Sequence, residues 1–221
     1  NFHSFLTSFP FYFTKNILKL RESSDALTLG SEVHEIAEKM TKGEEVKPDE
    51  RLAPYINCIR KILTEIEDQG YSAIDAEVKA TYPLAELMPT NETLHFLAKI
   101  DAVFRKGEEY LIVDWKTSAT DDNGSEYWQQ LEAYRRTYAL EKGIDLNKIR
   151  VAIAYVGLRK RINNGTIGCS FDDKQPSKSA FETITKKIEK LLSWKKDPQF
   201  YLAELAKSSA DDPLIRSIKE Q

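Results

Sequence analysis

The sequence is poor in cysteine, and it has no long apolar run. Its two cysteines, Cys58 and Cys169, lie far apart and form no C-x-x-C pattern. They cannot supply the four thiolates of a zinc or iron–sulfur site, and their scarcity is typical of a reducing cytoplasm. No apolar stretch approaches the roughly 18 residues that a membrane span requires, and no signal-peptide pattern opens the chain. We therefore expect a cytoplasmic protein with no membrane partner.

An excess of basic residues is also missing. The formal net charge is −3 and the isoelectric point is about 5.8, so no overall positive field indicates nucleic-acid binding. Two local basic clusters stand out from this background, and solvated surface explains each more simply than a phosphate-binding surface does. They are residues 159–161 and the group Lys186, Lys187, Lys190, Lys195 and Lys196.

The 221 residues show a succession of helical and extended patterns. Apolar residues at 3.6-residue spacing predict helices, and runs rich in β-branched and aromatic residues predict strands. Helices are expected at 26–42, 50–69, 125–142 and 177–195, after one or two short aromatic-rich helices within 2–20. Strands are expected at 73–82, 94–105, 110–116, 149–157 and 165–171. This order predicts an α/β fold in which helices flank a mixed central β-sheet.

The length of the chain favours one principal domain, because such a chain can bury about 70% of its unfolded surface in a single core. We expect this domain at 1–205, with N-terminal helices at 1–70 and a core at 73–195, followed by a tail at 206–221. The first residue is Asn1 rather than Met, so we expect the sequence to be a piece of a longer polypeptide.

The strand expected at 110–116 ends with an acid and a base, Asp114 and Lys116. Side chains alternate along a strand, so these two share one face. Leu111, Val113 and Trp115 then point to the other face, which their apolar character assigns to the core. An acid and a base are thereby placed together where a buried strand leaves the sheet.

A tight turn at 106–109 would set the pairing of this strand with the preceding one, placing Asp101 opposite Asp114 and Lys99 opposite Lys116. Opposed carboxylates repel each other unless a proton or a cation lies between them. Hard oxygen ligands suit Mg²⁺ or Mn²⁺, and a nearby lysine can orient a metal-bound water or offset the charge of a phosphate. The alternative is a surface acid pair flanked by lysines.

The spacing of Asp114 and Lys116 alone does not decide between these alternatives, because acid-x-lysine spacings recur at 45–47, 77–79 and 172–174. Two helices add context. His34 lies four residues after Gly30, on one flank of an apolar stripe, where it can supply a third metal ligand or act as a structural histidine. Gln130 and Tyr134 have the same spacing, and alone they can equally be a solvated amide and a packed ring.

A series of motifs runs through the chain in the order Gly30-x-x-x-His34, Asp101, Asp114-Trp115-Lys116 and Gln130-x-x-x-Tyr134. This series, which covers residues 1–195, resembles the RecB-like branch of the PD-(D/E)XK nuclease superfamily. The resemblance implies a restriction-endonuclease-like core. It also implies that the metal, Mg²⁺ or Mn²⁺, is bound by His34, Asp101, Asp114 and the main-chain carbonyl of Trp115.

The resemblance implies further roles around this metal. Lys116 would be the catalytic lysine, and Glu77 a further neighbour of the metal. Gln130 and Tyr134 would border the site and help to position DNA. Many relatives also hold an iron–sulfur cluster with one early and three late cysteines, but no cysteine follows Cys169 here, and the ligand count excludes such a cluster.

The function that the resemblance implies is a metal-dependent DNA nuclease, acting on single strands or duplex ends in the prokaryotic nucleoid. Relatives are often carried by UvrD-family helicases, so we expect a helicase domain in cis or in trans and a role in DNA repair or recombination. The alternative is a catalytically silent nuclease fold that serves as a module for DNA binding or scaffolding. A domain without any nucleic-acid role would require the ordered motifs to be a coincidence.

Overall fold

The computed structural model of the chain describes residues 25–47, 49–121, 124–159, 167–177, 179–197 and 199. The chain divides into two compact units, Ser24–Ser177 and a smaller unit that contains helix α7 (Ala180–Lys196). The segments expected at 2–20 and 206–221 lie outside the described residues. None of the described helices combines the length and the apolar character that a membrane span requires.

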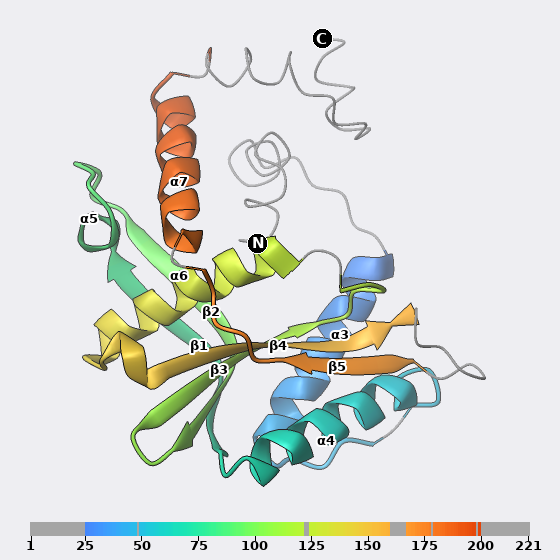
Figure 1. The fold of residues 1–221 in the computed structure, drawn as a ribbon. Helices are drawn as coiled ribbons and strands as arrows, with labels where there is room; N and C mark the ends of the chain where they lie inside the picture. The colour runs from blue at the N-terminus through green and yellow to red at the C-terminus, as the bar shows by residue number, and fades with distance from the viewer. Residues whose placement is uncertain are drawn as a thin grey trace, which may run out of the picture. The chain divides into compact units, whose positions relative to one another are not determined.

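A mixed five-stranded sheet forms the centre of the larger unit (Figure 1). Its strands lie in the order β1 (Ser72–Pro83), β2 (His95–Lys106), β3 (Glu109–Lys116), β4 (Ile149–Leu158) and β5 (Gly168–Asp172). β3 and β4 are parallel, and all other neighbours are antiparallel. Helix α6 (Gly124–Lys142) makes the crossover from β3 to β4 that a parallel pair requires. The predicted α/β class with a mixed sheet is confirmed.

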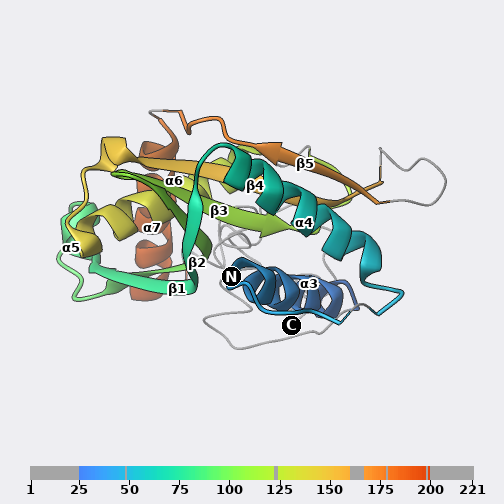
Figure 2. The same cartoon turned by 90° about the horizontal axis from the view of Figure 1, so that it is seen from below.

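Helices cover both faces of this sheet (Figures 1 and 2). α3 (Asp25–Thr41) and α4 (Ala53–Asp68) lie against one face, and α6 lies against the other. Two short elements were not expected from the sequence, namely α5 (Leu84–Leu87) and the 3₁₀ helix η2 (Leu146–Lys148). Elements of one turn are too short for an apolar period to reveal them.

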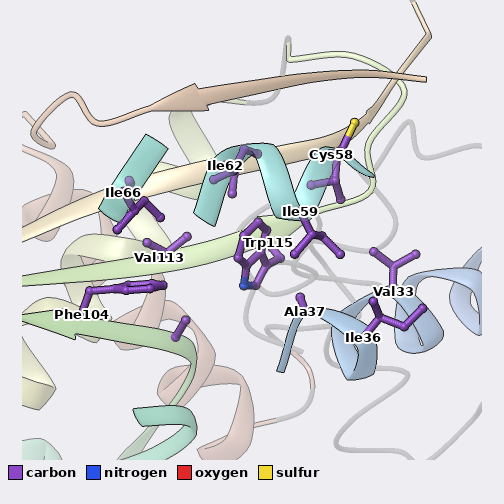
Figure 3. Close-up of a cluster of buried hydrophobic side chains, with 14 of the residues drawn as sticks. Val33, Ile36, Ala37, Cys58, Ile59, Ile62, Ile66, Phe104, Val113 and Trp115 are labelled. Carbon is purple, nitrogen blue, oxygen red and sulfur yellow. The ribbon is translucent and has the colours of Figure 1, made fainter. Parts of the chain in front are cut away.

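The main hydrophobic core lies between α3, α4 and the sheet (Figure 3). The isoleucines of α4 recur at three- and four-residue spacing, and all of them are buried, namely Ile56, Ile59, Ile62 and Ile66. Val33 and Ala37 of α3 meet the same cluster, as do Val113 and Trp115 of β3. The buried Trp115 ring therefore anchors the end of the strand that carries Asp114 and Lys116.

Helix α4 begins later than the expected residue 50, at Ala53. Pro54 lies in its first turn, where the missing N–H of proline removes no hydrogen bond and its fixed φ suits the helix. The preceding residues form a turn in which the backbone N–H of Arg51 donates to Asp49 Oδ1 at 2.8 Å. The sequence signal of Pro54 thus marks the true start of the helix.

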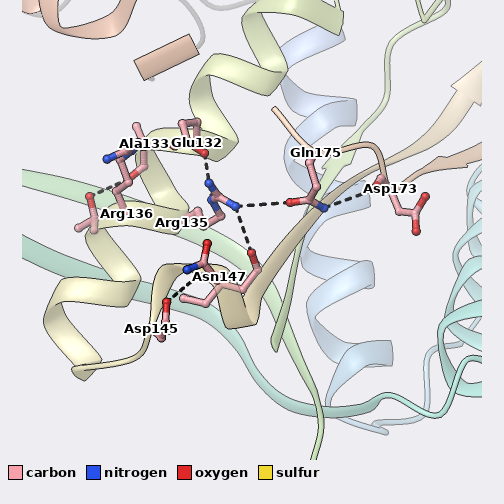
Figure 4. A network of polar contacts seen from close by, with 10 residues as sticks. Glu132, Ala133, Arg135, Arg136, Asp145, Asn147, Asp173 and Gln175 are labelled. Atoms are coloured by element: carbon pink, nitrogen blue, oxygen red, sulfur yellow. Dashed lines mark hydrogen bonds and ion pairs between the residues drawn. The ribbon is translucent and has the colours of Figure 1, made fainter. Parts of the chain in front are cut away.

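A polar network around Arg135 ties α6 to the sheet (Figure 4). The buried carboxylate of Glu132 forms ion pairs with Arg135 Nε at 2.9 Å and with Arg136 Nε at 2.7 Å. Arg135 Nη1 also donates to the carbonyl of Ile149, at the start of β4, and to Gln175 Oε1. A buried carboxylate needs such partners, because an unpaired buried charge is strongly destabilising. The network therefore fixes α6 against β4.

Candidate active site

β2 and β3 pair in the expected register, but their ladder ends just before the candidate catalytic residues. Five pairs connect the strands, and the last of them is Ala102↔Val113. The expected opposition of Asp101 to Asp114 would be the next pair, and that of Lys99 to Lys116 a later one. The ladder does not continue to either, so this part of the predicted geometry is corrected.

The side chain of Asp101 joins the two strands where their backbone ladder ends. Its Oδ2 accepts a hydrogen bond at 2.8 Å from the N–H of Trp115, a backbone group that a continued ladder would have used. The carboxylate thus takes the place of a strand carbonyl and satisfies this donor. β2 continues beyond this point with β1 as its partner, as far as Pro83↔His95.

Helix α3 places His34 beside the end of the β2–β3 ladder. His34 Nδ1 lies 3.3 Å from Asp101 Oδ2. His34, Glu77 and Asp101 each offer one ligand atom, and these atoms all lie within 4.8 Å of one another. The structure therefore brings one imidazole and two carboxylates together from α3, β1 and β2. We call these three residues the His34–Glu77–Asp101 cluster.

Glu77 reaches this cluster from an unusual backbone conformation. Its φ is +54°, in the left-handed region, and it is the one non-glycine residue with a positive φ in the described part of the chain. Such a conformation costs about 1–3 kcal/mol and is often retained where it positions a functional side chain. Glu77 also pairs with Lys99 at 2.5 Å.

The buried Asp114 forms an ion pair with the partly buried Lys116 at the end of β3. Asp114 is only 3% exposed. Within the described residues, the ion pair with Lys116 is the interaction of its Oδ2, which has no separate hydrogen-bond partner. The Lys116 ammonium also lies 4.8 Å from the centre of the Tyr127 ring, within the range of cation–π attraction. The Tyr127 hydroxyl is 2.9 Å from Ser118 Oγ. Asp114 and Tyr127 together therefore restrict the position of the Lys116 ammonium.

Sequence reasoning missed Tyr127 as a neighbour of the site. Tyr127 lies on α6 three residues before Gln130, and residues three apart on a helix share a face. That spacing was the signal that could have found it. The residue then lies beside the segment that follows Lys116, where its ring is tilted against that of Tyr155.

The charged groups of the site shift one another's pKa values. Burial alone would lower the pKa of Lys116, but the carboxylates of Asp114 and Asp101 outweigh this effect and raise it. Burial raises the pKa of Asp114 in spite of its contact with Lys116. Burial would also raise the pKa of Asp101, but the hydrogen bond and charge of His34 lower it. Asp101 in turn raises the pKa of His34 against the effect of burial.

Gln130 and Tyr134 lie one turn apart on α6 and are both buried. Gln130 Nε2 donates to the Tyr134 hydroxyl at 2.8 Å. This hydroxyl also forms a hydrogen bond with the backbone of Lys99. Burial and the charge of Asp114 raise the pKa of Tyr134. The two residues therefore border the carboxylates from the α6 side. The main-chain carbonyl of Trp115 stays a predicted ligand.

Close approach of two backbone segments occurs just after Lys116. A Cβ at Gly157 of β4 would lie 2.6 Å from the carbonyl oxygen of Thr117, which is closer than real atoms pack. Gly30 of α3 is not required in this way, because a Cβ there would lie 3.6 Å from Thr117 Oγ1, an ordinary contact. The position that requires glycine is therefore Gly157.

Gly157→Ala is expected to lower the free energy of unfolding by about 1–3 kcal/mol, because its methyl group must displace the Thr117 backbone. Gly30→Ala is the matched control near the same threonine. It is expected to be neutral or to stabilise the protein by up to about 1 kcal/mol, because alanine favours a helix. Chemical denaturation compares the two variants, and equal stability would contradict the special role of Gly157.

A family model for the PD-(D/E)XK nuclease superfamily matches residues 2–211. The chain belongs to this superfamily. No curated protein matches it significantly. Among solved structures 13 chains match, including one described as "Crystal structure of SSO0001". That structure has a TM-score of 0.44 and 10% sequence identity, and the match covers 85% of this chain and 73% of that chain.

PD-(D/E)XK nucleases typically use divalent metals, and the donor groups of this chain fit such an ion. The His34–Glu77–Asp101 cluster offers two carboxylates and an imidazole within ligand distance of one another. The charge of Asp101 acts on Asp114, which adds a further carboxylate nearby. Carboxylate oxygens suit Mg²⁺ and Mn²⁺, and the imidazole makes Mn²⁺ at least as suitable as Mg²⁺.

Proposed function

We propose that the chain is a metal-dependent DNA nuclease that hydrolyses phosphodiester bonds. The observation that carries the proposal is the position of the Asp114–Lys116 pair beside the His34–Glu77–Asp101 cluster. Membership of the nuclease superfamily supports it. A surface acid pair, the simpler interpretation of the sequence, does not explain why Asp114 is buried.

The His34–Glu77–Asp101 cluster would hold the ion, with Asp114 and the Trp115 carbonyl as further ligands. A bound divalent ion supplies the Lewis acidity that polarises a phosphate oxygen. Asp101 has a second task, because its hydrogen bond with the Trp115 N–H fixes the end of β3 against β2. The ion would also neutralise the carboxylates of the site, which would then repel the DNA backbone less. An acidic chain needs this reduction in repulsion to bind DNA.

Lys116 would act on the reacting phosphate as a cation. Asp114 and Tyr127 already restrict its ammonium group, so little orientational freedom is lost when substrate binds. A fixed positive charge stabilises the negative charge that develops on the phosphate oxygens. The same ammonium group can donate a hydrogen bond that orients the attacking water. Gln130 and Tyr134 would position the DNA from α6.

We also propose a subtype, a substrate class and a partner for this nuclease. The order of the motifs from Gly30-x-x-x-His34 to Gln130-x-x-x-Tyr134 supports a RecB-like nuclease domain at 1–205. Its substrates would be single strands or duplex ends, in repair or recombination at the prokaryotic nucleoid, with a helicase in cis or in trans. An iron–sulfur cluster with four cysteine ligands cannot form within this chain, which has two cysteines.

Cleavage of end-labelled single strands, duplexes and forked DNA tests the proposal directly. Products are expected with Mg²⁺ or Mn²⁺ and none with EDTA, and Mn²⁺ should support at least as much cleavage as Mg²⁺ because one ligand is an imidazole. The same gels report polarity and distinguish exonuclease from endonuclease action. A folded chain that binds these DNAs but cuts none of them with either metal would contradict the proposal and favour the silent scaffold.

A further inference from the structure

β1 and β2 form a two-stranded ribbon beyond the point where β3 leaves β2. The ribbon begins beside the candidate site at Val78↔Ile100 and ends at Pro83↔His95. Its side chains alternate between a buried and an exposed face, as those of a strand pair do. The first two pairs on the buried face are Val78↔Ile100 and Ala80↔Ala98. The first two on the exposed face are Lys79↔Lys99 and Thr81↔Leu97.

The exposed face of the ribbon carries two lysines directly opposite each other. Lys79 and Lys99 are partners in the β1–β2 register. Opposed residues of antiparallel strands hold their Cβ atoms about 4.5–5.5 Å apart, and like charges at this distance are unfavourable. Glu77 offsets the charge of Lys99 at 2.5 Å. No described carboxylate forms an ion pair with Lys79, so the pair keeps a net positive charge.

This lysine pair lies next to the His34–Glu77–Asp101 cluster. Lys99 precedes Asp101 by two residues on β2, so both side chains leave the same face of the strand. The contact between Lys99 and Glu77 joins the pair to the cluster directly. Along the ribbon, positive charge therefore follows immediately after the acidic groups.

We propose that Lys79 and Lys99 bind the DNA phosphates next to the one that is cleaved, so that the strand follows the exposed face of the β1–β2 ribbon. The inference rests on the proposed nuclease function and adds the path of the substrate. A phosphate bound between the two ammonium groups would offset their mutual repulsion. Lysine–phosphate contacts also supply much of the affinity of proteins for DNA. The pair provides locally the positive charge that a chain of net charge −3 lacks overall.

Binding of a fluorescein-labelled single strand to the full chain tests this path, in EDTA to prevent cleavage and at several salt concentrations. The double variant K79A/K99A should reduce the slope of log Kobs against log salt by about 0.7 for each phosphate that the lysines no longer neutralise. In cleavage assays with Mn²⁺ it should raise KM more than it lowers kcat. Lys79→Ala alone should show part of both effects.

Lys148→Ala is the matched control, because Lys148 is another exposed lysine with an acidic partner, Glu108, at the turn between β2 and β3. Its salt slope should equal that of the wild type. An unchanged slope in K79A/K99A, with a wild type that cleaves DNA, would overturn this inference alone. A wild type that binds but never cleaves would overturn the proposed function instead. An effect limited to Lys99→Ala, with lower Mn²⁺ affinity, would mean that Lys99 only supports Glu77 and would overturn the phosphate role.

Discussion

Asp101→Asn is expected to lower DNA cleavage by about 10³-fold. Asparagine retains an oxygen that can accept the Trp115 N–H, so the end of β3 should stay in place. The substitution removes the negative charge beside His34 and with it a ligand of the proposed metal. The kcat/KM on end-labelled DNA, measured with saturating Mn²⁺, gives the size of the effect.

Two further measurements separate loss of metal from misfolding in this variant. Mn²⁺ at 100 times its Kd should stabilise the wild type by about 2.7 kcal/mol, and the variant should lose most of that gain while its metal-free stability changes little. Because Asp101 raises the pKa of His34, the variant should titrate His34 at a lower pH in NMR spectra. Cleavage close to the wild-type rate by a folded Asp101→Asn would remove Asp101 from the site.

Lys116→Met is expected to lower cleavage by about 10²–10³-fold, because methionine keeps much of the side-chain length but not the charge. It should also destabilise the fold by about 3–5 kcal/mol, since Asp114 becomes a buried carboxylate without its partner. Steady-state kinetics and chemical denaturation measure the two effects separately. Lys106→Met is the matched control, because Lys106 also lies over a tyrosine ring, that of Tyr71, but at the other end of β2.

The double variant Asp114→Asn/Lys116→Met separates catalysis from stability. Removing both charges of a buried pair costs far less than removing one, so the double variant should regain most of the stability that Lys116→Met loses. It should not regain cleavage. If it did, or if Lys116→Met cleaved DNA like the Lys106→Met control, Lys116 would have no catalytic role.

Much of the fold could be predicted because its signals are local. The isoleucine spacing of α4 predicts a buried helical face, and all four residues are buried. The turn at 106–109 fixes the register of β2 and β3, because a two-residue loop permits few pairings. The resulting alternation correctly assigns Val113 and Trp115 to the core and leaves Asp114 on the other face.

The details of the site depend on contacts between residues that are distant in the sequence. The sequence pattern could not predict these contacts. Asp101 bonds to the backbone of Trp115 and ends the ladder, which a rule of continued pairing does not anticipate. A left-handed backbone conformation is usually marked in a sequence by a turn-forming residue such as glycine. Glu77 is not such a residue, so its positive φ could not be predicted. The requirement for Gly157 appears only when β4 packs beside Thr117.

Anomalous X-ray diffraction from crystals of the chain soaked in Mn²⁺ would locate the bound ion and identify its ligands. We expect a strong Mn²⁺ peak in contact with the side chains of His34 and Asp101, and the loss of that peak in crystals of Asp101→Asn. A saturating soak that leaves these side chains without Mn²⁺, or places the ion on residues outside the site, would contradict the proposed metal site.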